Sequence, residues 1–114
     1  MIIVLPGEYI AADVVWRNTG EMAIAPHFRL DLRESGLAFW HNGVPLRADS
    51  VLPGATGTVT IMQRVPLDWA PSTSIDVKID VEEVGKVWEQ MDAFITASAK
   101  PSIEIVSVTP YVVE

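Results

Sequence analysis

In Tyr9-Ile-Ala-Ala-Asp-Val-Val-Trp-Arg17, every second side chain is apolar, and the positions between them include Asp13 and Arg17. Since successive side chains of a strand point to opposite faces of a sheet, this pattern predicts a strand with one buried face. Asn18-Thr-Gly20 follows and ends the strand, because Asn and Gly favour turns. The predicted buried face carries Ile10, Ala12, Val14 and Trp16.

The same alternation recurs along the rest of the chain. It is clearest in Ile75–Glu82, where Ile and Val occupy one face and Asp76, Lys78, Asp80 and Glu82 the other. About seven to eight short strands, spaced roughly 8–12 residues apart, predict an all-β fold, a two-sheet antiparallel β-sandwich with an extra C-terminal strand. The further strands are expected at residues 24–33, 37–41, 44–46, 58–65 and 93–99, with a hairpin turn at Asn42-Gly43 and a connection through 85–91.

Length and composition indicate one packed domain. The chain has 114 residues, of which 49% are hydrophobic, and its mean hydropathy is +0.27. We expect residues 1–100 to form the sandwich and residues 101–114 to form a separate C-terminal arm. The absence of cysteine excludes a disulfide scaffold. The net charge of −7 argues against a nucleic-acid partner, and no apolar run is long enough for membrane insertion.

Two Pro-Gly turns precede predicted strands. Leu5-Pro-Gly-Glu8 comes before the first strand, and Leu52-Pro-Gly-Ala-Thr-Gly57 comes before the strand at 58–65. With Asn18-Thr-Gly20 and the strand spacing, they resemble the immunoglobulin-like CARDB domain and related bacterial and archaeal surface-repeat domains. The resemblance covers roughly Leu5 to Ala99. It implies an immunoglobulin-like sandwich but no particular role, because such sandwiches serve many functions.

The C-terminal arm has a strand pattern of its own. Ile103-Glu-Ile-Val-Ser-Val-Thr-Pro110 is rich in β-branched residues and ends at proline. In the domains that the chain resembles, such a strand usually precedes the Pro-Gly-Glu turn, but Met1-Ile-Ile-Val-Leu5 leaves almost no room for it. Three interpretations are open: donation to a neighbouring subunit, a fold-back onto the same domain, and a tandem repeat that continues after residue 114. A flexible terminus is the simplest alternative.

Of these interpretations we expect donation. In such sandwiches the first and last strands lie parallel where they pair, and a parallel return needs a crossover of roughly a dozen residues. Only Lys100-Pro-Ser102 separates the arm's strand from the one expected at 93–99. The protein is therefore its own expected partner, as a homo-oligomer. The arm residues predicted at this interface are Ile103, Ile105, Val106, Val108 and Tyr111.

The chain also has four tryptophans. Trp16 lies on the predicted buried face, so we expect it in the core. Trp40, Trp69 and Trp88 lie near expected turns, where an exposed aromatic ring can anchor a protein contact or stack on a sugar. We therefore include these three in the predicted protein interface, with carbohydrate as a second candidate ligand.

Catalytic and metal-binding patterns are not apparent. His27 and His41 fall on different expected strands, and without cysteine a zinc site would need both of them together. A Ser-His-Asp set can be assembled from Ser50, His41 and Asp49, but the sequence has no nucleophile-elbow motif. The acidic row that includes Asp76 and Asp80 lacks the glycine-containing loop typical of calcium sites. We expect no enzymatic activity, no cofactor and no bound metal.

These observations predict a structural or assembly protein. An acidic, free-standing sandwich with a donor-like arm and no visible signal peptide suits a virion component made in the host cytoplasm, such as a phage head-decoration or tail-associated protein. Its partners would then be itself and another structural protein. The alternative is a module of a secreted, multi-domain protein at the cell surface, used for adhesion, spacing or carbohydrate binding.

Overall fold

The computed structural model describes residues 2–97 and 106–113. The described part is built from strands, and it contains no helix long and apolar enough to cross a membrane. The strands are β1 (Ile2–Val4), β2 (Tyr9–Arg17), β3 (His27–Glu34), β4 (Leu46–Arg47), β5 (Thr56–Arg64), β6 (Ser74–Val81) and β7 (Gly85–Thr96).

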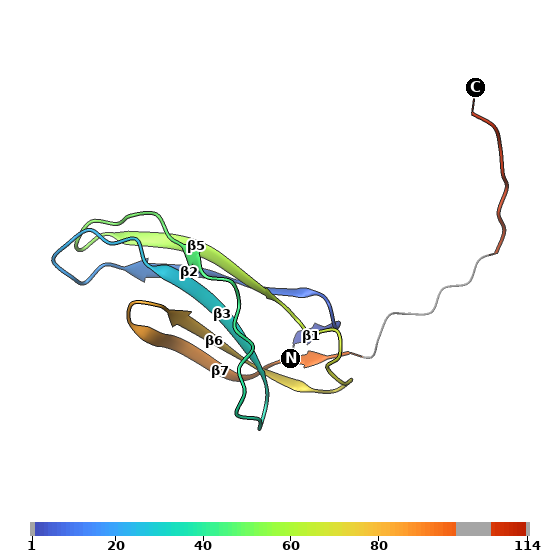
Figure 1. Cartoon of the computed structure of the whole chain (residues 1–114), viewed down its shortest axis with the longest axis horizontal. Coiled ribbons are helices and arrows are strands. Elements are labelled where there is room, and N and C mark those ends of the chain that lie inside the picture. Colours follow the sequence, from blue (N-terminus) through green and yellow to red (C-terminus); the bar gives the residue numbers. More distant parts are fainter. Residues whose placement is uncertain (1, 98–105, 114) are drawn as a thin grey trace.

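The strands form two sheets of unequal size (Figure 1). The larger sheet has the order β1-β7-β6-β3-β4, and the smaller sheet holds β2 and β5. Their inner faces share one hydrophobic core, so the prediction of an all-β, two-sheet sandwich is confirmed. The resemblance to CARDB-type domains stays a prediction.

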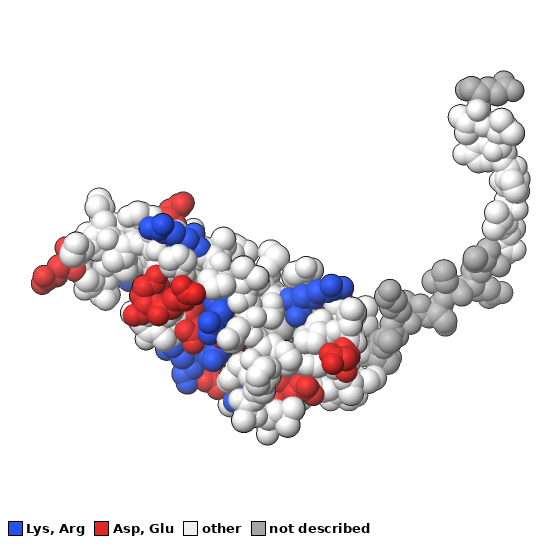
Figure 2. Space-filling model, viewed as in Figure 1, with Lys and Arg blue, Asp and Glu red and all other residues white. Residues whose placement is uncertain are grey.

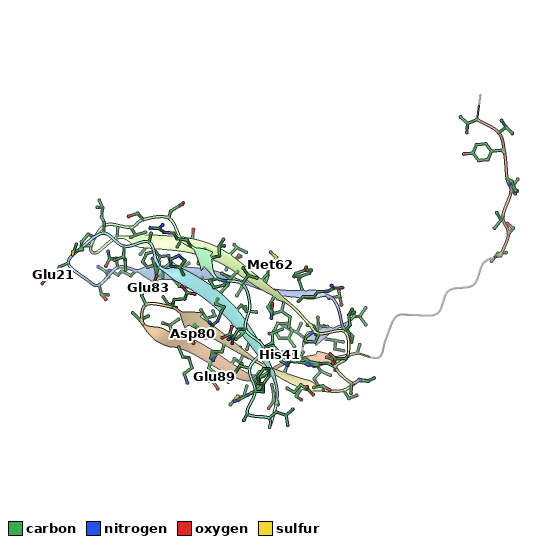
Figure 3. The ribbon with its side chains drawn as sticks, in the orientation of Figure 1. Glu21, His41, Met62, Asp80, Glu83 and Glu89 are labelled. Atoms are coloured by element: carbon green, nitrogen blue, oxygen red, sulfur yellow. The ribbon has the colours of Figure 1, made fainter. Side chains whose placement is uncertain are left out.

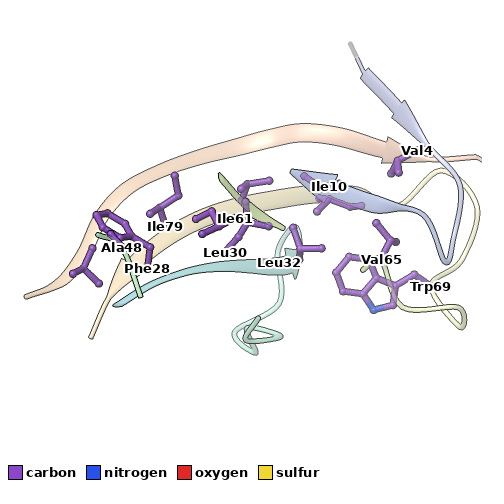
Figure 4. Close-up of a cluster of buried hydrophobic side chains, with 13 residues drawn as sticks. Val4, Ile10, Phe28, Leu30, Leu32, Ala48, Ile61, Val65, Trp69 and Ile79 are labelled. Atoms are coloured by element: carbon purple, nitrogen blue, oxygen red, sulfur yellow. The ribbon is translucent and has the colours of Figure 1, made fainter. Parts of the chain in front are cut away.

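The core lies where β2 and β5 face the middle of the larger sheet (Figure 4). The residues predicted to face inward on β6 are buried there, and Trp16 packs against the cluster, as expected. Trp69 is also buried in it, although it lies in the loop between β5 and β6. The buried cluster consists of Val4, Ile10, Phe28, Leu30, Leu32, Ala48, Ile61, Val65, Trp69, Ile75, Val77, Ile79 and Val81.

The start of the chain corrects one expectation. Residues 1–5 leave little room for a strand, yet Ile2–Val4 forms β1 and pairs in parallel with Phe94–Thr96 of β7. The beginning of the chain and the end of β7 therefore lie side by side (Figure 1). Among the described residues, β1 covers only this end of β7, and no strand lies beside the rest of that edge, from Gly85 to Ala93.

The last strand of the domain is longer than predicted. Residues 85–91 were expected to form a connection and 93–99 a strand, but Gly85–Thr96 is a single strand, β7. A tight turn, in which Val84 N–H donates to the carbonyl of Val81 and Gly85 has φ of 89°, joins β6 directly to β7. Two register shifts in the β6–β7 pairing and a φ of 50° at Asp92 interrupt the alternation. These irregularities concealed the strand, because a bulge shifts the period-two pattern by one residue.

The hairpin predicted at Asn42-Gly43 is absent from the described fold. His41 instead bridges to Leu32, and β4 pairs with the start of β3, so residues 41–47 follow the edge of β3. Gly43 serves a close backbone approach: a Cβ placed there would collide with the carbonyl oxygen of Leu30. The Asn-Gly dipeptide was misleading because glycine is needed for close packing as well as for tight turns.

Candidate strand-accepting groove

The larger sheet has five strands and the smaller sheet two, and this difference leaves a groove of about 1280 Å³ along one side of the sandwich. One wall comes from β2 and the loop after it, and the other comes from β6, β7 and the turn between them. The groove occupies the end of the sandwich where β2 finishes and β7 begins. Its apolar lining includes Val14, Trp16, Phe28, Ile79, Val81, Val87 and Trp88.

The inner face of β7 is the uncovered part of this groove. Residues paired across neighbouring strands point to the same face, and Trp88 lies opposite Ile79 and Gln90 opposite Val77. Ile79 and Val77 belong to the buried core, so Trp88 and Gln90 also face inward, yet both are exposed. A smaller sheet that continued past β2 would cover them.

The backbone of β2 borders the groove with an edge that no described strand pairs with. Asn18 N–H donates to the carbonyl of Ala55, and Val65 N–H donates to that of Glu8, so even-numbered residues of β2 bond to β5. In an antiparallel pair these roles alternate along the strand. The N–H and C=O groups of Ala11, Asp13 and Val15 therefore point away from β5, and no strand lies beside this edge in the described part of the chain.

Asn18 holds the loop at the far end of the groove. Its side chain is fully buried, and Nδ2 donates to the carbonyls of Met22 at 2.8 Å and Val51 at 2.9 Å. The side-chain oxygen accepts from Gly20 N–H at 2.9 Å. Every polar atom of this buried amide is thus paired, which fixes the path of the residues that close the groove.

A histidine-carboxylate pair lies at the rim of the groove. His27 Nδ1 lies 2.7 Å from Glu83 Oε1, and His27 N–H donates to the same carboxylate. The hydrogen bond from His27 holds the pKa of Glu83 below its ordinary value of 4.5. Figure 3 shows Glu83 and Glu21 at the end of the molecule away from the end of β7. The pair ties the β6–β7 turn to the start of β3.

The outer face of the larger sheet carries interleaved acidic and basic side chains (Figure 2). Asp76 was expected to be solvent-exposed, but it is only 1% exposed. Burial raises the pKa of Asp76, but hydrogen bonds from Ser35 Oγ, Asp92 N–H and Arg33 outweigh that effect and hold the pKa below its ordinary value. Among the described residues, salt bridges join acidic and basic side chains of this face to one another.

The three tryptophans predicted at an interface lie in three different environments. Trp88 is 44% exposed and lines the groove. Trp40 lies on the outer face, with the Arg33 guanidinium 4.3 Å and Lys78 Nζ 4.6 Å from its ring centroid. Trp69 is buried in the core. They therefore do not form a common aromatic platform of the kind on which a sugar would stack.

The two histidines lie apart in the fold. His41 packs edge-on against Phe39 and Trp69, whereas His27 contacts Glu83. Within residues 2–97 and 106–113, no group of three or more His, Cys, Asp or Glu side chains is arranged to hold a metal ion.

The C-terminal arm is described only in part. Ile103 and Ile105 lie outside the described residues. Val106, Val108 and Tyr111 are 90%, 75% and 83% exposed, and residues 106–113 have no strand pairing. This segment lies clear of the two sheets in Figure 1.

Sequence reasoning did not locate the groove. The signal available was the short apolar pair Val87-Trp88, which was assigned to a connection rather than to a strand. A comparison with models of known protein families finds none that matches the chain, and a comparison with curated proteins finds no match.

Proposed function

We propose that this chain is a non-enzymatic structural protein whose copies assemble by strand addition. The arm of one copy, residues 101–114, would lie against the sandwich of the next. The observation that carries this proposal is the exposed inner face of β7 beside the edge of β2, which pairs with no strand in the described part of the chain. Exposed apolar grooves in soluble domains commonly mark contact sites.

The arm is mostly uncharged and apolar, like the lining of the groove. Between Ser98 and Val113 the only charged residues are Lys100 and Glu104, and β-branched residues predominate from 103 to 108. Burying one exposed Val or Ile side chain contributes roughly 1.5–3 kcal/mol. Such side chains, added to backbone hydrogen bonds along an open edge, give strand addition both affinity and specificity.

We further propose that the assembly is part of a virion, as a phage head-decoration or tail-associated component. Passing an arm from each copy to the next is a head-to-tail contact, which closes into a ring or continues as a filament. Both products suit a particle built from repeating surfaces. The acidic net charge of −7 suits docking to protein rather than to nucleic acid.

A module of a secreted, multi-domain surface protein is the alternative. The Pro-Gly turns favour it, because they resemble those of surface-repeat domains; Gly7 and Gly54 adopt φ of 88° and 79°, which suits glycine in such a turn. The groove would then be filled by an adjoining domain of the same chain. The neighbouring genes distinguish the two settings, because capsid or tail genes support the first and an open reading frame with further repeats supports the second.

The mass in solution tests assembly directly. We would measure light scattering after size exclusion for the full chain and for a chain ending at Lys100, which keeps every buried core residue. We expect an oligomer for the full chain and a monomer for the shortened one. Equal masses for the two chains would contradict assembly through the arm.

A further inference from the structure

We infer that the free edge of β2 is the acceptor: the arm of a second copy pairs with it in the antiparallel direction and fills the groove. This inference rests on the proposed function and adds the acceptor strand and the direction of the donor strand. The occupant is a second copy of this chain, and the contact is made by the edge groups of Ala11, Asp13 and Val15 together with the groove beneath them.

Of the open edges in the described fold, only that of β2 can close the core. A strand added to β7 would extend the larger sheet and leave the inner face of Trp88 open. A strand added to β5 would extend the side where Ala48 and Val51 are already buried. A strand added to β2 would extend the smaller sheet over the inner face of β7. It would thereby cover the exposed ring of Trp88.

The reach of the arm excludes its own copy as an antiparallel donor. Val4 pairs with Thr96, and Leu5–Glu8 forms a turn into β2, so β2 starts at the end of the sandwich where β7 finishes. An antiparallel donor that covers the whole of β2 starts opposite Arg17, about 27 Å along β2 and about 10 Å across the sheets. The chain from Thr96 to Ile103 spans at most about 25 Å. The antiparallel donor must therefore come from another copy.

The arm's sequence sets which side chains enter the groove. Ile103 and Ile105 share one face of an extended strand, and Glu104, Val106 and Val108 share the other. The face without the carboxylate is the one that enters an apolar groove. In the proposed pairing, Ile103 and Ile105 would therefore point inward, and Glu104 would remain in solvent.

Two proline substitutions, one on the free edge of β2 and one on the outer edge of β5, test whether β2 is the acceptor strand. Val15→Pro removes an N–H that points away from β5 and leaves the β2–β5 bonds in place, because proline is tolerated where its nitrogen faces outward on an edge strand. Thr58→Pro is the matched control, since Thr58 lies opposite Val15 and its N–H points to the outer edge of β5. We expect Val15→Pro to be monomeric by light scattering and Thr58→Pro to assemble like the parent chain.

The outcomes separate this inference from the proposed function. If the chain ending at Lys100 is monomeric but Val15→Pro still assembles, the arm drives assembly and the assignment to β2 is wrong. If the shortened chain assembles like the full chain, both the proposed function and the inference fail.

Amide hydrogen exchange gives a second readout that needs no substitution. Assembly should slow exchange at Ala11, Asp13 and Val15 by at least about tenfold relative to the chain ending at Lys100. Exchange at the outer edge of β5 should not change. Equal rates at the three β2 amides in the full and shortened chains would overturn the assignment, whatever the proline variants do.

Discussion

Ile79 and Trp88 lie directly opposite each other on the inner face of the β6–β7 pair, yet Ile79 is 6% exposed and Trp88 is 44% exposed. Two neighbours on one face normally share one environment. They differ here because the smaller sheet ends at β2, before it reaches β7. The difference marks the boundary between the finished core and the open groove.

That boundary predicts unequal costs for two truncations. Ile79→Ala should lower the free energy of unfolding by about 2–4 kcal/mol, because it leaves a cavity in the core. In the chain ending at Lys100, Trp88→Ala should cost about 1 kcal/mol or less, because its ring is already partly in water. Urea denaturation of both variants measures the difference. Similar costs would show that Trp88 is packed by something in the monomer.

The two faces of the arm predict unequal effects on assembly. Ile103→Ser and Ile105→Ser should each weaken association by at least about tenfold, because a buried aliphatic side chain contributes roughly 1.5–3 kcal/mol. Val108→Ser is the matched control, since it should face solvent and change association little. Sedimentation equilibrium of the full-length variants checks this. A larger loss for Val108→Ser would mean that the opposite face of the arm enters the groove.

Disulfide cross-linking tests the direction of the donor strand. The chain has no cysteine, so only the introduced cysteines can form a disulfide. The acceptor is the chain ending at Lys100, with Cys in place of Arg17 or Tyr9. The donor is the full chain with Val15→Pro and Glu104→Cys, which cannot accept an arm. An antiparallel donor places Glu104 near Arg17, so a disulfide should form with Arg17→Cys and not with Tyr9→Cys. The reverse result would establish a parallel donor.

The buried carboxylate of Asp76 predicts a loss of stability in acid. Its pKa in the folded protein lies below the ordinary value of 3.8, so its stabilising contribution is present above that pH and is lost as the pH falls through the folded value. Asp76→Asn should lower the free energy of unfolding by roughly 1–3 kcal/mol at pH 7. The difference from the parent chain should shrink below pH 3.8. Urea denaturation at neutral and acid pH tests both statements, and a difference independent of pH would contradict them.

The close approach at Gly43 predicts a large cost for a single methyl group. In Gly43→Ala the new Cβ would meet the backbone carbonyl of Leu30, which cannot rotate away as a side chain can. We expect a loss of about 2 kcal/mol or more. Gly36→Ala is the comparison, because Gly36 has φ of 88° and open space around it, so only about 1 kcal/mol of backbone strain is expected. Equal melting temperatures for the two variants would contradict the role assigned to Gly43.

Strands with an unbroken period-two pattern were predictable from sequence. Residues 9–17 form β2 as expected, and the strands predicted at 58–65 and 75–82 agree with β5 and β6 within about two residues. The errors fall where another effect disguised the pattern. Bulges interrupted the alternation of β7, so most of that strand was not predicted. Gly43, which is needed for close packing against Leu30, was predicted to lie in a hairpin turn before β4. Asp76 was placed outside because alternation reports the direction of a side chain and not whether Arg33 covers it.

The candidate groove was beyond the reach of sequence reasoning. Its walls come from β2 and from β7, which are far apart in the chain. The groove is open because the smaller sheet has fewer strands than the larger one. The arm's strand pattern was visible in the sequence, but the unpaired edge able to receive it was not.

By itself, the sequence determined the all-β fold class, the inward faces of β2 and β6, and the apolar character of the arm, because these depend on neighbours one or two residues away. Only the tertiary structure decided that the smaller sheet stops at two strands, that β1 lies parallel to the end of β7, and that Trp88 is left uncovered. Those features depend on pairing between residues distant in the chain. The alternation within a strand predicts its buried face but does not predict which strand it pairs with.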